Sequence, residues 1–135
     1  MNTKILSNIL LIDDDEPTNF YHSLMIEESG VCLNIHVKDS AVEALEWLKN
    51  DDNPIPDLIF LDINMPIMNG WEFLEEYRAL PDVKKSNIVV IMLTTSLNPN
   101  DMEKAKQMKE ISSFMNKPLT IENIKNLVNE QFALT

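Results

Sequence analysis

Five short runs rich in apolar residues alternate with longer segments whose apolar residues recur at helical spacing, and this alternation constrains the fold more than any other feature. Short apolar runs bounded by turn signals are typical of strands, and strands that alternate with helices predict a parallel sheet covered by those helices. The runs lie at residues 9–12, 31–38, 58–61, 88–93 and 111–115. We therefore expect an α/β fold over the whole chain.

The residues within the five runs predict where each strand lies in the sheet. The runs at 9–12, 58–61 and 88–93 are continuously apolar, which is typical of central strands with helices on both faces. The run at 31–38 alternates apolar and polar residues, and the run at 111–115 contains two serines, so we place both at the edges. This arrangement agrees with the flavodoxin-like (βα)5 fold, a five-stranded parallel sheet in the order 2-1-3-4-5 with helices on both faces.

Start signals and apolar stripes predict the helices that connect the strands. The expected helix starts are Pro17, Ser40 with Glu43 at capping-box spacing, Asn98-Pro99 and Thr120. In the first helix, the apolar side consists of Phe20, Tyr21, Leu24 and Met25. Gly30 is expected to end that helix.

Length, charge and hydropathy exclude several classes of protein. The chain has 135 residues, about one domain, and its formal net charge of −11 argues against nucleic-acid partners, whose phosphates require clustered Lys and Arg. No apolar segment approaches the roughly 20 residues that span a bilayer, and Ser7 and Asn8 interrupt the apolar N-terminus, unlike a signal peptide. We therefore expect a single cytoplasmic domain over residues 1–135, with no output domain and no membrane partner.

The cysteine and histidine residues point to no metal site of their own. Cys32 is the only cysteine, so the chain forms no internal disulfide and offers no Cys-based metal site. His22 and His36 lack partners at metal-binding spacing, and we expect them to be surface or half-buried side chains.

Acidic, hydroxyl and basic side chains follow the expected strands at the points where these strands end. They are Asp13-Asp14-Asp15-Glu16, Asp62, Thr94-Thr95-Ser96 and Asn116-Lys117-Pro118. Because the carboxyl ends of parallel strands share one edge of a sheet, these side chains are expected to meet there.

Such a group of carboxylates requires a positive charge. At about 4 Å and an effective dielectric constant near 20, each carboxylate pair costs on the order of 4 kcal/mol. Mg²⁺ is a hard cation that prefers oxygen ligands, and Asp13, Asp14 and Asp62 offer them. Asp13, Asp14 and Asp62 contribute a formal charge of −3, the ion +2 and Lys117 +1, so the filled site has no net formal charge. Such a site can accept a phosphoryl group, because the ion and the lysine share its negative charge.

Asp62 is the candidate nucleophile. It stands alone at the end of its strand, whereas Asp13 and Asp14 form a pair better suited to hold a metal. A carboxylate that attacks phosphorus forms a mixed anhydride, which hydrolyses readily and so suits a reversible signal. Thr94 and Lys117 are expected to bind the phosphoryl oxygens and neutralise their charge.

The motifs resemble the signature of receiver domains of two-component response regulators, in that family's order and with similar spacing. The segments that carry the resemblance are Leu11-Ile12-Asp13-Asp14-Asp15, Leu61-Asp62-Ile63-Asn64-Met65-Pro66 with Asn69-Gly70, Leu93-Thr94, and Asn116-Lys117-Pro118. The resemblance covers the chain from about Asn8 to Phe132.

The resemblance implies a role for each matching residue. Asp13 and Asp14 form the acid pair, Asp62 is the phosphoacceptor, Asn64 is a metal ligand through its backbone carbonyl, Thr94 is the switch hydroxyl, Lys117 is the phosphate-sensing lysine and Phe114 is the switch aromatic. Two positions depart from the family pattern: Phe114 lacks the hydroxyl of a tyrosine, and Thr95 is larger than the usual Ala or Gly.

The resemblance also implies a function. A single-domain (CheY-like) receiver accepts a phosphoryl group from a sensor histidine kinase or histidine phosphotransfer protein in a Mg²⁺-dependent reaction. It catalyses only its own phosphorylation and dephosphorylation, and it signals to a downstream protein through the face formed by its fourth helix, fifth strand and fifth helix.

Two other functions stay open at this point. The segment from Leu10 to Thr18 also resembles the first motif of haloacid-dehalogenase-type phosphatases, in which Asp13 is the nucleophile and Asp15 the acid. Those enzymes need a late acidic pair, but after Lys117 only Glu122 and Glu130 remain. The third possibility is a receiver-like interaction module that does not use phosphorylation.

Overall fold

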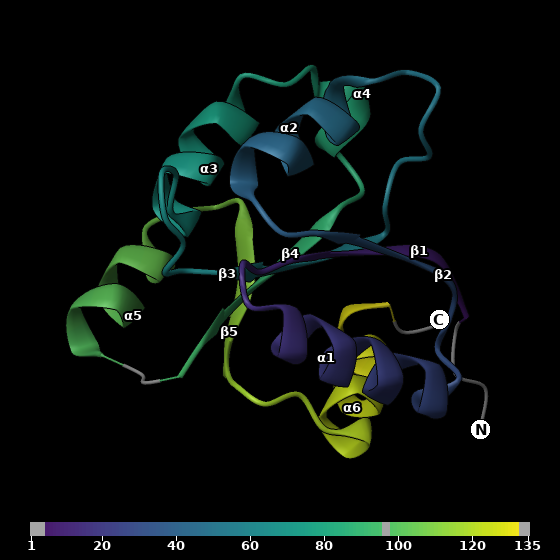
Figure 1. Ribbon diagram of the computed structural model, residues 1–135. Helices are drawn as coiled ribbons and strands as arrows, with labels where there is room; N and C mark the ends of the chain where they lie inside the picture. Colours follow the sequence, from purple (N-terminus) through teal and green to yellow (C-terminus); the bar gives the residue numbers. More distant parts are fainter. Residues whose placement is uncertain (1–4, 96–97, 133–135) are drawn as a thin grey trace.

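A five-stranded parallel sheet in the order β2-β1-β3-β4-β5 lies between two layers of helices in the computed structural model, which describes residues 5–95 and 98–132 (Figure 1). The strands are β1 (Leu6–Ile12), β2 (Cys32–Lys38), β3 (Leu58–Asp62), β4 (Val89–Thr94) and β5 (Ile111–Asn116). The helices are α1 (Glu16–Ser29), α2 (Ala41–Lys49), α3 (Gly70–Arg78), α4 (Asp82–Lys85), α5 (Pro99–Lys106) and α6 (Ile121–Gln131). This topology confirms the flavodoxin-like order and the edge positions expected for β2 and β5.

The sheet divides the hydrophobic core into two parts. Helices α1 and α6 lie side by side and cover one face of the sheet, and α2 and α3 cover the other (Figure 1). The central strands contribute side chains to both parts: Leu10 and Ile59 pack towards α2 and α3, whereas Leu11 and Phe60 pack towards α1 and α6. None of the helices in the described part of the chain combines the length and apolar character needed to cross a bilayer.

A sixth helix, α4, was not predicted from the sequence. It has a single turn and no buried residue, so it leaves no apolar stripe for a periodicity argument to detect. Instead Lys84 holds it against the end of α2: its Nζ donates to the carbonyls of Leu48 at 2.9 Å and Lys49 at 3.0 Å and pairs with Asp51 at 2.7 Å. The fourth and fifth helices expected from the sequence therefore correspond to α5 and α6.

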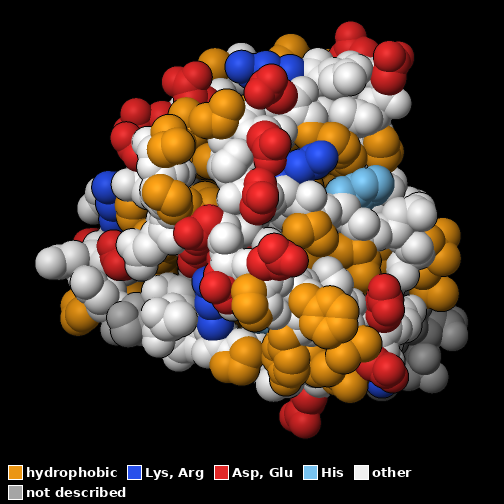
Figure 2. Space-filling view, in the orientation of Figure 1, with side chains coloured by type: hydrophobic (Ala, Val, Ile, Leu, Met, Phe, Trp, Pro, Cys, Tyr) orange, Lys and Arg blue, Asp and Glu red, His pale blue; other side chains and the backbone are white. Residues whose placement is uncertain are grey.

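Helix α1 differs most from the sequence-based expectation. Its predicted apolar side faces outward, with Phe20 72% exposed, and Figure 2 shows hydrophobic side chains gathered over α1 and α6 on this face of the molecule. The residues that α1 buries are Asn19, His22, Ile26 and Ser29. Polar side chains occupy the inner face because each buried one makes a hydrogen bond to the backbone: Asn19 to Asp13, His22 to Leu119 and Ser29 to Ile26.

Strand β2 is an edge strand whose apolar residues are only partly covered. Leu33 is 72% exposed and Val37 is also exposed, although both belong to the apolar side of the alternating pattern. On the other side, the ring of His36 packs against Trp47, with the ring centroids 4.8 Å apart, and its Nε2 lies 2.8 Å from Asn8 Oδ1. The alternation of apolar and polar residues along β2 therefore does not separate a buried side from an exposed one.

Three helices begin with the capping residues expected from the sequence, and α3 begins with a capping box that was not expected. The hydroxyls of Ser40 and Thr120 and the Asn98 side chain accept hydrogen bonds from backbone N–H groups in the first turns of their helices. Asn69 and Glu72 form a reciprocal capping box at the start of α3, directly after the loop that follows Asp62.

Two glycines are required for different physical reasons. Gly30 adopts φ +70° after α1, with open space around the position of a Cβ atom. At Gly70 a Cβ atom would lie 2.7 Å from the Asp62 carbonyl oxygen and 3.0 Å from Ile63 Cα, so the start of α3 packs directly on the backbone of the Asp62 segment.

We expect Gly70→Ala to lower the free energy of unfolding by about 3 kcal/mol, because rigid backbone atoms block the added methyl group. Gly30→Ala is the matched control, and it should cost about 1 kcal/mol, since it forces only an unfavourable φ. Urea denaturation of both variants measures the difference. A smaller loss for Gly70→Ala than for Gly30→Ala would contradict the close packing at α3.

Candidate functional site

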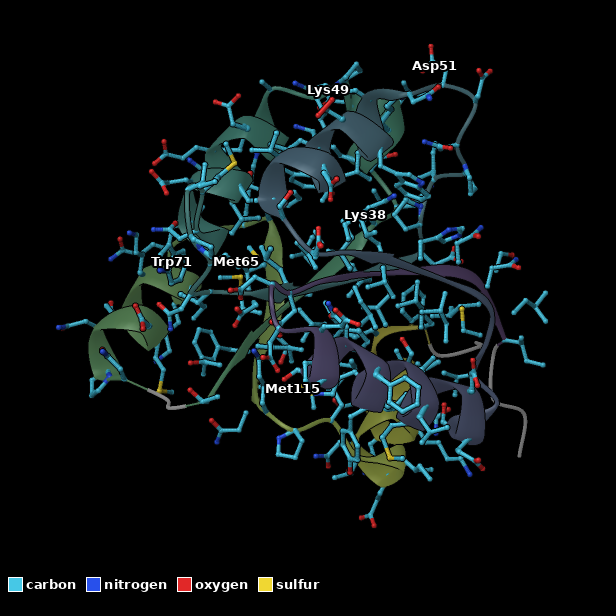
Figure 3. The ribbon with its side chains drawn as sticks, viewed as in Figure 1. Lys38, Lys49, Asp51, Met65, Trp71 and Met115 are labelled. Atoms are coloured by element: carbon cyan, nitrogen blue, oxygen red, sulfur yellow. The ribbon has the colours of Figure 1, made fainter. Side chains whose placement is uncertain are left out.

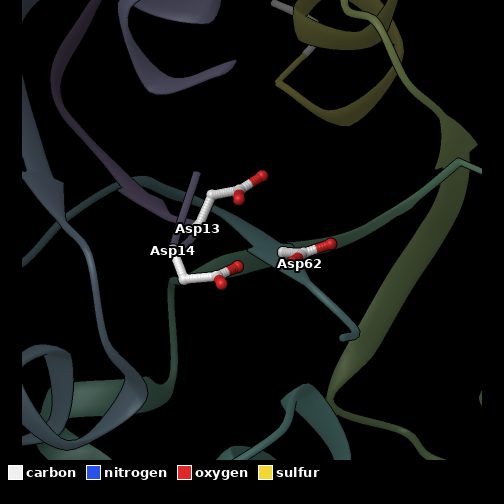
Figure 4. Close-up of side chains that lie close together, drawn as sticks. All are labelled: Asp13, Asp14 and Asp62. Atoms are coloured by element: carbon white, nitrogen blue, oxygen red, sulfur yellow. The ribbon is translucent and has the colours of Figure 1, made fainter. Parts of the chain in front are cut away.

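Three carboxylates meet at the carboxyl ends of β1 and β3. Asp13 and Asp14 follow β1, Asp62 is the last residue of the neighbouring strand β3, and one carboxylate oxygen of each lies within 4.8 Å of the others (Figure 4). Asp13 and Asp62 are buried, 4% and 5% exposed, whereas Asp14 is exposed. Parallel strand direction thus brings together the acids as the sequence predicted.

Lys117 supplies a positive charge to the two buried acids. Its Nζ lies 2.6 Å from Asp13 Oδ2 and 2.9 Å from Asp62 Oδ1. Its backbone N–H donates to the carbonyl of Thr94 at 2.7 Å, which fixes the end of β5 against the end of β4. The ion pairs are well shielded from water, since none of the three side chains is more than 11% exposed.

The electrostatics of the site favour binding of a further cation. Burial raises the pKa of Asp62, and the charges of Asp13 and Asp14 act in the same direction, while Lys117 opposes them. Burial lowers the pKa of Lys117, but its hydrogen bonds to Asp13 and Asp62 outweigh this effect, so its pKa is raised. Three carboxylates and one ammonium group leave a formal charge of −2, which a divalent cation neutralises.

The two threonines at the end of β4 have different surroundings. Thr94 is buried. It lies beside the site, because the preceding residue of β4, Leu93, pairs with Asp62 of β3. Thr95 is exposed and lines an open cavity of about 320 Å³ whose wall also includes Tyr21, His22 and Lys117. Thr95, which is larger than the usual Ala or Gly, thus forms part of the wall of this cavity. Ser96, which the sequence grouped with these two, lies outside the described residues.

Two further residues named from the sequence lie near the site, and their roles stay predictions. Asn64 is exposed in the loop between β3 and α3, two residues after Asp62. Phe114 is partly buried on β5, where it pairs with Met92 and lines a groove with Met102 of α5.

The loop after Asp62 carries further features that the sequence did not reveal. Ile67 adopts φ +70° and is almost fully exposed, although β-branched residues rarely occupy this region. Met65 is buried, and Trp71 lies in the first turn of α3 (Figure 3). The Lys104 Nζ of α5 lies 4.8 Å from the centre of the Trp71 ring, a cation–π contact that joins α3 to α5.

Asn19 and His22 are the main residues of the site that sequence reasoning missed. Asn19 Nδ2 donates to the carbonyl of Asp13 at 2.7 Å, and His22 Nε2 accepts from the backbone N–H of Leu119 at 3.2 Å. His22 is only 1% exposed, so the prediction of a surface or half-buried imidazole is wrong. The available signal was the spacing of Asn19 and His22, two polar residues three apart on the helix that follows the acidic cluster. This spacing places both side chains on one face of the helix.

The comparisons with known proteins agree with one another. A family model described as "Response regulator receiver domain" matches residues 9–129. A crystal structure of a two-component response regulator from Cytophaga hutchinsonii is 30% identical, with a TM-score of 0.85, and covers 97% of this chain and 100% of its own.

Two curated proteins extend the same similarity. Response regulator Rcp1 from Synechocystis sp. is 26% identical over 89% of this chain and 82% of its own length. Sensor histidine kinase CheAY from Helicobacter pylori is 29% identical over 93% of this chain, and the matching part is 15% of that larger protein. A domain similar to this chain thus occurs both in a response regulator and within a histidine kinase.

We expect Mg²⁺ to stabilise the fold through the acidic cluster. At a concentration 100 times its dissociation constant, the ion should add about 2.7 kcal/mol to the free energy of unfolding. Asp14→Asn should lose most of this gain, because it removes one ligand and leaves the ion pairs of Lys117 intact. Urea denaturation with and without MgCl₂ at constant ionic strength measures both effects. Asp82→Asn, which alters an exposed acid away from the cluster, is the control; equal stabilisation of all three proteins would contradict a site at Asp14.

His22 should make folding stability depend on pH. Burial lowers its pKa from 6.5 to about 4, so between these values the unfolded state binds more protons than the folded state. Stability from this residue is therefore complete above pH 6.5 and falls by on the order of 3 kcal/mol as the pH drops towards 4.

The measurement is the free energy of unfolding from pH 4.5 to 7 for the wild type and His22→Gln. Because the carboxylates titrate in both proteins, the difference between the two curves isolates the histidine. Parallel curves would show that the imidazole is not held in its neutral form.

Proposed function

The chain belongs to the response regulator receiver domain family, and we propose that it acts as a single-domain switch which takes a phosphoryl group onto Asp62. Receiver domains are signalling phosphoacceptors rather than classical enzymes. The observation that carries the proposal is the buried Asp62 carboxylate, which lies within reach of an acid pair and pairs with Lys117 at 2.9 Å.

The chemistry is an in-line transfer between a phosphohistidine and Asp62. A carboxylate oxygen of Asp62 attacks the phosphorus, the phosphorus–nitrogen bond breaks, and the imidazole leaves with its electron pair and takes up a proton. The product is an acyl phosphate, whose later attack by water releases inorganic phosphate and restores the carboxylate. Both steps leave the rest of the chain chemically unchanged.

The residues around Asp62 provide the positive charge and the positioning that this transfer needs. The carboxylates of Asp13, Asp14 and Asp62, with the backbone carbonyl of Asn64, form the set that would hold Mg²⁺, and hard oxygen donors of this kind suit that ion. When bound, Mg²⁺ would neutralise the phosphoryl oxygens. Lys117 transfers its hydrogen bond from Asp62 to a phosphoryl oxygen, and Thr94 donates its hydroxyl to another.

The signal is a change in the surface around β5. The phosphoryl group draws Thr94 inward, Phe114 moves into the vacated space, and the face formed by α5, β5 and α6 changes shape. Phosphorylation shifts a pre-existing equilibrium only by the difference in its affinity for the two states.

The partners follow from the same chemistry. The donor is a sensor histidine kinase or a histidine phosphotransfer protein, and the receiver of the signal is a protein that binds the α5–β5–α6 face. We place the reaction in the cytoplasm and assign residues 1–135 to one domain. The buried ion pairs of Lys117 with Asp13 and Asp62 support this function over an interaction module that does not use phosphorylation.

The phosphatase alternative, with Asp13 as nucleophile, receives no support. Both oxygens of Asp13 are engaged, Oδ1 with the N–H of Asp15 at 2.9 Å and Oδ2 with Lys117. The Asp15 side chain caps α1 by accepting the N–H of Thr18 at 3.0 Å. Glu122 and Glu130, the only acids after Lys117, are exposed on α6.

We expect the purified protein to gain one phosphoryl group from acetyl phosphate and Mg²⁺, as measured by intact-mass spectrometry. Asp62→Asn should abolish the gain, and Asp14→Asn should slow it by at least about 100-fold, because a metal ligand is lost. Asp57→Asn is the matched control at the opposite end of the same strand, where Asp57 accepts the N–H groups of Ser7 and Asn8.

The control variant should be phosphorylated as the wild type is. Modification that persists in Asp62→Asn, or that appears without Mg²⁺ at the same rate, would count against the proposed acceptor and its metal. Steady release of phosphate from a phosphomonoester that survives in Asp62→Asn would instead favour the phosphatase.

A further inference from the structure

The inner face of helix α1 makes polar contacts, whereas a helix that covers a sheet normally buries apolar side chains there. Asn19 and His22 are 5% and 1% exposed, while the neighbouring Phe20 points to solvent. Burial of an amide and an imidazole is unfavourable unless hydrogen bonds replace the lost water, so the partners of these two side chains define what the helix holds.

The two partners are the backbones of the segments that carry the central ion pair. Asn19 binds the carbonyl of Asp13, and His22 binds the N–H of Leu119, two residues after Lys117. Asn19 and His22 are three residues apart on one helix face. A single turn of α1 therefore holds the backbone at Asp13 and the backbone just after Lys117 at a fixed spacing. The side chains of these two residues form the ion pair, with Lys117 Nζ 2.6 Å from Asp13 Oδ2.

The position of the His22 contact is significant for Lys117. Before Lys117, the chain is held by the hydrogen bond of its own N–H to the Thr94 carbonyl. After Lys117 comes Pro118, which has no N–H, so Leu119 offers the first amide that can hold this side of the loop. His22 binds that amide, and the loop is thus held on both sides of the lysine.

We infer that His22 is a positioning residue for phosphoryl transfer: by accepting the Leu119 N–H, its imidazole fixes the loop that delivers Lys117 to Asp62. This inference rests on the proposed function, because it assigns His22 to the same site. The geometry requires the neutral imidazole with its proton on Nδ1, and the lowered pKa of His22 is consistent with that form. His22 itself touches neither the phosphoryl group nor the metal ligands.

Loss of the acceptor should slow phosphoryl transfer, because it displaces Lys117 from the Asp62 carboxylate. Small displacements of a catalytic group reduce rates strongly. For His22→Leu, which keeps the bulk but removes the acceptor, we expect phosphorylation by acetyl phosphate at saturating Mg²⁺ to be about tenfold slower. His22→Gln places an amide oxygen near the same point and should restore most of the rate.

The matched control is Ile26→Val, on the same buried face of α1 one turn further on and without a hydrogen bond to the loop. It tests whether a loosened helix alone slows the reaction, and it should react at the wild-type rate. Equal slowing of His22→Leu and Ile26→Val, or no slowing of His22→Leu, would overturn the inference and leave Asp62 as the acceptor.

One NMR measurement tests the contact without a variant and without the reaction. In the ¹⁵N-labelled wild type, a scalar coupling across the hydrogen bond should link the Leu119 amide nitrogen to His22 Nε2, and its absence would refute the contact. In His22→Leu the Leu119 amide proton should exchange with solvent faster than in the wild type, and His22→Gln should restore its protection.

These outcomes separate the two proposals. If acetyl phosphate leaves the wild type unmodified, the proposed function fails, and the role of His22 in phosphoryl transfer fails with it. If the wild type is modified and His22→Leu reacts at the wild-type rate, only the positioning role fails.

Discussion

The ammonium group of Lys117 is the contact on which the rest of the site depends. It pairs with Asp13 at the end of β1 and with Asp62 at the end of β3, and the backbone of the same residue binds Thr94 at the end of β4. One residue at the end of β5 therefore joins four neighbouring strand ends. Because the charges are buried, removal of one partner leaves another without compensation, which makes the arrangement sensitive to any change in charge.

This arrangement fits the proposed switch on a rigid sheet. The strands hold the backbone of each acid in place, while the charge on the acids is only partly neutralised. In the proposed function, a phosphoryl group on Asp62 would draw the hydrogen bond of Lys117 from the Asp62 carboxylate, and the sheet would not need to deform. The movement would then be confined to the side chains and loops around β4 and β5, where Thr94, Phe114 and α5 lie.

The sequence predicted the sheet order and the acidic cluster because both depend on patterns that are local in the chain. Continuous apolar runs identify central strands, and strand direction alone brings Asp13, Asp14 and Asp62 to one edge. The inward side of α1 was not predictable in this way, since its apolar residues indicate the opposite face. The partners of Asn19 and His22 lie in other parts of the fold, and one of them, Leu119, follows 97 residues after His22. Helix α4 escaped detection for a related reason, because its stability comes from the contact of Lys84 with α2.

The open edge of β2 has a consequence for the behaviour of the protein in solution. An edge strand offers unpaired backbone groups, and here Leu33 and Val37 add exposed apolar surface beside them. The net charge of −11 keeps such edges apart by repulsion between molecules, which salt screens over about 8 Å at physiological ionic strength. Near the isoelectric point of about 4.4 this repulsion vanishes, so colloidal stability is lowest there and association through β2 is favoured. The acidity that argues against nucleic-acid partners thus also keeps the protein molecules apart in solution.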